Sequence, residues 1–167
     1  MYIFILYPHG LLDQWLVRTV GDATVKLLGL WSEYTYTAHH TPASYFNGTL
    51  LKQASCMILL QGRWPVLDIQ APCNGLDLMV LAAGFVWCFP ASNRRKAFFI
   101  PFCIALVFTI NVLRCCLLCD IRVELPAYFD FMHKFFFNLA AYLAVFASWV
   151  LFIGFKRRDS TADLAID

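Results

Sequence analysis

The sequence predicts an all-α fold, a multi-pass transmembrane helical bundle with a small outward-facing N-terminal region. Hydrophobic residues make up 60% of the chain and charged residues only 14%, whereas soluble domains carry roughly 25% charged residues. Mean hydropathy is +0.64. Three apolar segments are the clear spans, and four or more spans result if residues 1–17 or a segment upstream of them contribute.

Length and charge limit the organisation and the partners. The 167 residues suit a single domain, and the net charge of +2 is too small to indicate nucleic acid as a partner. We expect one membrane domain over residues 1–167. Its parts are an interfacial, extracytoplasmic region (1–70), a transmembrane core (71–158) and a cytoplasmic tail (159–167).

The N-terminal 70 residues contain scattered charges and no apolar run long enough to span. Asp22 to Tyr34 places Val25 and Leu28 on one face, which indicates an interfacial helix. Farther on, two short apolar runs between Ser55 and Pro72 flank a turn that contains glycine, as in a hairpin. This hairpin would deliver the chain to the first membrane helix.

Length defines the membrane helices. Phe98 to Leu118 and Phe135 to Phe155 each provide about the 20 apolar residues that a span needs, and Arg114 is the only charge inside either. A third segment, from about Asn74 to Pro90, reaches about 17 residues, near the lower limit. These three segments are the predicted spans.

Basic residues predict the orientation, because cytoplasmic loops are enriched in Lys and Arg. The clusters 94–96 and 156–158 both lie at helix ends that this rule assigns to the cytoplasm. Cys73, Arg114 and His133 then lie together at the extracytoplasmic surface of the inner membrane. Topology alone brings these three residues to one side.

A thiol, an imidazole and a guanidinium are the groups that acyl transfer uses. A thiolate activated by an imidazole attacks a carbonyl and forms an acyl-enzyme, and the imidazole can protonate the leaving amine. A cation shielded from water stabilises the oxyanion. An arginine inside a span costs about 2.5 to 3.5 kcal/mol on insertion scales, so Arg114 is a functional candidate.

Three further residues are possible supports. Asn111 precedes Arg114 on the same helical face and could orient it or a substrate carbonyl. Asn74 follows Cys73 directly, and Asp77 lies one turn beyond it. Asp77 could orient His133 or pair with Arg114. It could equally be a carboxylate at a helix start, where its negative charge interacts favourably with the helix dipole.

The segment Pro72-Cys73-Asn74-Gly75-Leu76, the pair Asn111-x-x-Arg114 and the isolated His133 resemble, in this order, the signature blocks of the exosortase/archaeosortase family. This resemblance covers roughly residues 55–155. The chain looks like a compact bacterial form, with Asn74 where many relatives have Ser and with fewer helices before the cysteine block.

The resemblance implies a membrane cysteine transpeptidase or protease that cleaves C-terminal sorting signals of exported proteins. Cys73 would be the nucleophile, His133 the base and Arg114 the electrostatic stabiliser. The substrate would carry its own anchor helix and enter sideways from the lipid bilayer, and the new C-terminus would pass to an unknown envelope acceptor, an amine or water. We expect no cofactor and no metal.

Two other functions are compatible with the residues. A non-enzymatic scaffold or assembly subunit could pair Arg114 with an acidic partner helix. A thiol-disulfide oxidoreductase could use Cys116 and Cys119, whose spacing allows pairing on one helical face.

Overall fold

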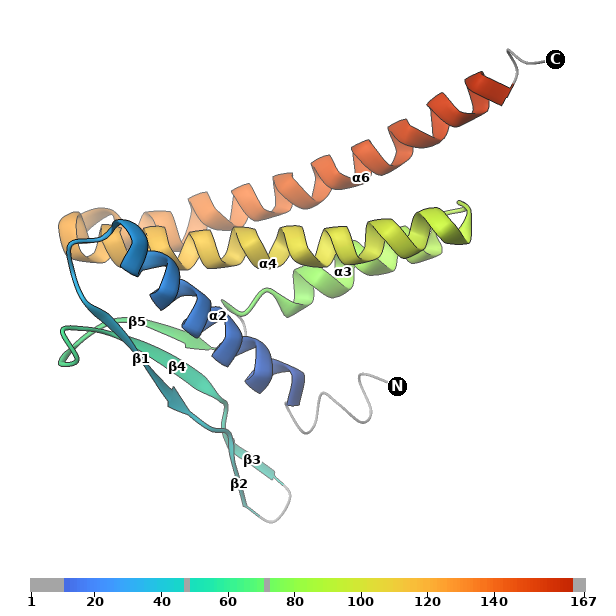
Figure 1. Ribbon diagram of the computed structural model, residues 1–167. Coiled ribbons are helices and arrows are strands. Elements are labelled where there is room, and N and C mark those ends of the chain that lie inside the picture. The colour runs from blue at the N-terminus through green and yellow to red at the C-terminus, as the bar shows by residue number, and fades with distance from the viewer. Residues whose placement is uncertain (1–10, 47–48, 71–72, 164–167) are drawn as a thin grey trace.

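The computed structural model describes residues 11–46, 49–70 and 73–163 and is mostly helical (Figure 1). The expectation of an all-α fold is wrong in one respect, because five short strands occupy much of the region before the cysteine. The strands β1 (Tyr36–Thr41), β4 (Ser55–Leu60) and β5 (Trp64–Gln70) form an antiparallel sheet in the order β1-β4-β5. β2 (Ser44–Phe46) and β3 (Thr49–Lys52) form a separate two-stranded pair.

The hairpin predicted between residues 55 and 72 is present as β4 and β5. Gln61 and Gly62 have φ of 52° and 69°, and the Arg63 amide donates to the Leu60 carbonyl over 3.1 Å. Two consecutive positive φ values match the right-handed twist of the flanking strands. The strand β1 was not predicted, because its partner β4 lies far along the chain and its own sequence alternates weakly.

Helix α2 (Leu11–Trp31) is longer than the predicted interfacial helix and begins earlier. It packs on β1 and β4 with one face and on α4 with another (Figure 1). The buried residues Val17, Val20 and Leu28 recur at helical spacing and point into this layer. Residues 1–10, part of the proposed additional span, lie outside the described residues.

Two helical segments in the described chain are long and apolar enough to cross a membrane, not three or more. They are α4 (Asn93–Glu124) and the segment Pro126–Gly154. The third predicted span is corrected to α3 (Leu76–Cys88), whose 13 residues measure only about 20 Å. The backbone bends at Gly75 and after Cys88 and thereby ends α3 at both sides. The helix is therefore shorter than the hydrocarbon core of a bilayer, which is about 30 Å thick.

The second crossing segment is assembled from four consecutive pieces. It begins with η3 (Pro126–Tyr128) and α5 (Phe129–Phe131), passes through the π-helical turn η4 (Met132–Phe136) and continues as α6 (Phe137–Asp163). α6 runs beside α4 and diverges from it toward the C-terminus (Figure 1).

Two hydrophobic cores lie along α4. One joins α2, the sheet and the later turns of α4, and includes Ile58, Ile69 and Leu118. The other joins α3, the first half of α4 and α6, and includes Val86 and Phe152. The segment that carries Cys73 passes from the first core to the second.

Candidate active site

Cys73 lies in the short connection between β5 and α3 and is partly exposed. The next residue, Asn74, is 1% exposed and fixes this connection by two hydrogen bonds. Its Nδ2 donates to Oδ1 of Asp13 on α2 over 2.7 Å, and its Oδ1 accepts from the Leu76 amide over 2.8 Å. One side chain therefore ties the cysteine segment both to α2 and to the start of α3.

A second tether comes from α4. Nδ2 of the buried Asn111 donates to the Cys73 carbonyl over 3.0 Å. Gly75, with φ of 81°, makes the sharp bend that brings the segment against this side chain. Asn111 thus holds the cysteine backbone and contributes to the position of its thiol.

His133 belongs to η4, the π-helical turn that precedes α6. Such turns widen a helix locally and are frequent at functional sites. The imidazole is stacked on the Phe129 ring with centroids 5.7 Å apart, and the Arg122 guanidinium covers Phe129 at 4.7 Å. This stack restricts the orientation of the imidazole.

Cys73, Arg114 and His133 line one small cleft. The remaining walls come from β5 and α4 and consist of Leu67, Asp68, Ile69, Cys115 and Leu118. Three residues from three separate elements therefore meet at one place. Within the described chain, Arg114 makes no hydrogen bond or ion pair, so its charge is available to a bound group.

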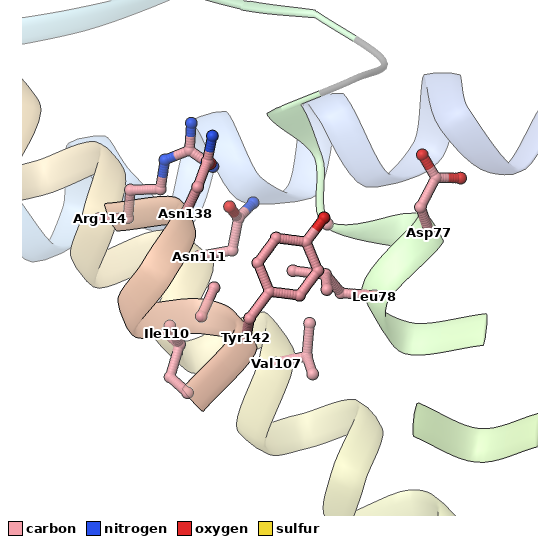
Figure 2. A pocket seen from close by; sticks show the side chains of 10 residues that line it. Asp77, Leu78, Val107, Ile110, Asn111, Arg114, Asn138 and Tyr142 are labelled. Carbon is pink, nitrogen blue, oxygen red and sulfur yellow. The ribbon is translucent and has the colours of Figure 1, made fainter. Parts of the chain in front are cut away.

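The Arg114 side chain also lines a larger pocket of about 190 Å³ between α3, α4 and α6 (Figure 2). Asn111 of α4 and Asn138 and Tyr142 of α6 line the same pocket (Figure 2). Apolar side chains, Leu78 among them, form the deeper wall. The pocket leads from between the membrane helices to the residue that borders the cysteine cleft.

The family model described as transmembrane exosortase (Exosortase_EpsH) matches residues 1–155. The chain belongs to the transmembrane exosortase family. No curated protein and no solved structure is significantly similar to this exosortase.

Among the described residues of this exosortase, Asp77 makes no ion pair with Arg114. It lies in the first turn of α3, as the alternative of a carboxylate at a helix start requires, and it lines the larger pocket (Figure 2). The second predicted span ended at Leu118, whereas α4 continues to Glu124, so Arg114 lies farther from the helix end than the sequence predicted. The extra turns pack against α2, where Trp31 Nε1 donates to Oδ2 of Asp120 over 3.2 Å.

The other cysteines differ from Cys73 in their surroundings. Cys56 is fully buried between the sheet and α2, and burial raises the pKa of its thiol to about 11. Cys116 and Cys119 are also fully buried and form no disulfide. Their burial leaves no room for the exchange partner that a redox site requires.

No group of three or more His, Cys, Asp or Glu side chains within the described residues is arranged to hold a metal ion.

Asp13 is one residue of the site that sequence analysis missed, as it missed Phe129, Asn138 and Tyr142. It lies 61 positions from Asn74, on a helix that was expected to begin later. No local pattern marks such a partner, although an acidic residue within the largely apolar stretch Leu11 to Val17, which also contains Gln14, is a signal of a specific contact.

Proposed function

We propose that this exosortase is a membrane cysteine transpeptidase or protease that cleaves C-terminal sorting signals of exported proteins. The observation that carries the proposal is the shared cleft of Cys73, Arg114 and His133. Family membership supports the same class of chemistry. The active site would face the extracytoplasmic side of the inner membrane, as the basic clusters predict.

In the first half-reaction, the Cys73 sulfur attacks the scissile carbonyl while His133 takes the thiol proton. The carbonyl π electrons move to oxygen, and the Arg114 guanidinium stabilises this oxyanion in a site where little water screens the charge. Collapse of the intermediate breaks the C–N bond. His133 returns the proton to the leaving amine, and a thioester remains on Cys73.

In the second half-reaction, an amine or water attacks the thioester and His133 acts as base. The oxyanion forms again beside Arg114, and its collapse releases the Cys73 thiolate and the new C-terminus. The acceptor belongs to the envelope, and its chemistry decides between transpeptidation and hydrolysis.

The larger pocket supports a lateral route for the substrate. It lies between membrane helices, ends at Arg114 and is lined by side chains of both polar and apolar character. An anchor helix in the bilayer could place the extended residues that precede it in this pocket. The scissile bond would then lie next to the cysteine cleft.

Mass spectrometry of the C-termini of envelope proteins tests this function. Cells that carry the native chain or Cys88→Ala, a variant of an exposed cysteine at the far end of α3, should contain trimmed C-termini. Cells that carry Cys73→Ala should retain the full-length forms. Identical C-termini in all three strains at matched expression would contradict the proposal.

A further inference from the structure

A second cavity lies far from the cysteine, between the first turns of α4 and the second half of α6. It is an open groove of about 670 Å³, lined by Ser92, Arg94, Arg95, Phe98, Phe99, Phe102 and Leu151. Arg94 and Arg114 are 20 residues apart on one continuous helix, which places them about 30 Å apart. This is about the thickness of a hydrocarbon core. The groove therefore opens at the opposite membrane boundary.

The three basic residues at this boundary have different surroundings. Arg95 donates to the Phe152 carbonyl and covers the Phe152 ring at 5.0 Å. Lys96 Nζ donates to the Trp87 carbonyl over 2.7 Å. Arg94 is exposed and makes no hydrogen bond or ion pair with any described residue. It is the cation of this cluster that remains available to a ligand.

The apolar wall continues directly from Arg94. Phe98 and Phe102 follow at intervals of four residues, so the three side chains form one stripe that runs about 12 Å along α4. Leu151 of α6 faces this stripe across the groove. A charged head and an apolar wall in this order match the head and the acyl chain of a lipid.

The positive charge of the groove favours an anionic group such as a phosphate. The lining includes two arginines and no acidic residue. The Ser92 hydroxyl, at the N-cap of α4, makes no capping hydrogen bond and is free to donate. The positive end of the helix dipole adds to the same field.

We propose that this groove binds an anionic phospholipid, with its phosphate at Arg94 and Ser92 and an acyl chain along Phe98, Phe102 and Leu151. The bound lipid fills the gap between α4 and α6 and fixes the depth of both helices in the bilayer. This inference is independent of the catalytic chemistry and holds for any activity of the chain.

Native mass spectrometry of the purified full chain tests the site with phosphatidylglycerol and phosphatidylcholine of identical acyl chains. The native chain should retain phosphatidylglycerol about fivefold better, the effect of about 1 kcal/mol expected for one arginine at a membrane surface. Arg94→Gln should remove this preference and Arg94→Lys should keep it. Arg63→Gln, on the exposed β4–β5 turn, is the matched control and should behave as the native chain.

Leu151→Trp tests the place of the acyl chain, because the larger side chain occupies the groove. It should weaken retention of both lipids alike. Three results would overturn the proposal: an unchanged preference in Arg94→Gln, equal retention of glycerol phosphate and of the lipid, or a dimer of the chain that displaces lipid from the groove.

Discussion

Arg114 faces both the cysteine cleft and the larger pocket, so one side chain connects the proposed substrate route with the proposed chemistry. It makes no ion pair in the described structure. A charge kept without a partner in a span is costly, and a bound carboxylate, carbonyl or oxyanion would compensate for this.

Replacement of Arg114 tests this role. Arg114→Gln should lower the rate of precursor cleavage about 10²- to 10³-fold, the usual effect of losing one oxyanion donor. Arg114→Lys keeps the charge but not the planar guanidinium group. Its cleavage rate should lie between the rates of the native chain and of Arg114→Gln. Pulse-chase labelling of a sorting-signal precursor measures the rate. Native activity in Arg114→Gln would remove the arginine from the mechanism.

At the scale of single residues, helix order and basic clusters predicted that Cys73, Arg114 and His133 share a membrane surface. The structure places all three along one cleft, and the side of the membrane that this cleft faces stays a prediction. Contacts that depend on side-chain direction could not be predicted in this way. The expected partners of Asp77 and the contact between Asp13 and Asn74 are examples.

At the scale of elements, the cysteine segment is held between α2 and α3. The link to α2 depends on a charge-assisted hydrogen bond from Asn74 to Asp13, a type worth about 1.5 to 3 kcal/mol. This link would position the nucleophile without touching the substrate.

Asp13→Ala should therefore lower the cleavage rate about tenfold, while Asp13→Asn, which keeps an oxygen acceptor, should retain most activity. Asp22→Asn is the matched control, because Asp22 links the same helix to β1 through His40 and not to the cysteine segment. Equal cleavage rates in Asp13→Ala and the native chain would show that α2 does not position the nucleophile.

The bend at Gly75 gives a second prediction for an element. Its φ of 81° is strained for any residue with a Cβ, although a Cβ there would meet Asn111 only at ordinary contact distance, 3.5 Å. Gly75→Ala should thus destabilise the fold by about 1 to 2 kcal/mol through the backbone alone.

Gly84→Ala serves as the control, since this glycine lies within α3 with open space around it. It should stabilise the chain by about 0.5 to 1 kcal/mol. Thermal unfolding in detergent measures both changes. A Gly75→Ala variant as stable as the native chain would contradict the strained turn.

Helices and strands whose sequence signal lies within a short stretch of the chain were predictable, and those that depend on distant residues were not. The apolar runs of α4 and α6 and the β4–β5 hairpin were recognised from the sequence. The pairing of β1 with β4 was not, because it joins residues such as His40 and Cys56 across a long separation. The length of α3 depends on where its flanking turns end it, which hydropathy does not resolve.

At the scale of the whole molecule, α4 connects the two sites for which we propose functions. The cleft with Cys73 lies beside the sheet and α2, and the basic groove lies at the far end of the same helix. Two separate hydrophobic cores stabilise these ends. The proposed chemistry and the proposed lipid site therefore lie on one continuous helix, about 30 Å apart.

The central claim is that Cys73 carries the acyl group during turnover. Peptide mass spectrometry of the chain, isolated from cells that overproduce a sorting-signal substrate and alkylated under acid conditions, measures this directly. We expect a hydroxylamine-sensitive acyl adduct on the Cys73 peptide, and none on that peptide in Cys73→Ala. An adduct on another cysteine, or substrate cleavage that persists in Cys73→Ala, would contradict the account.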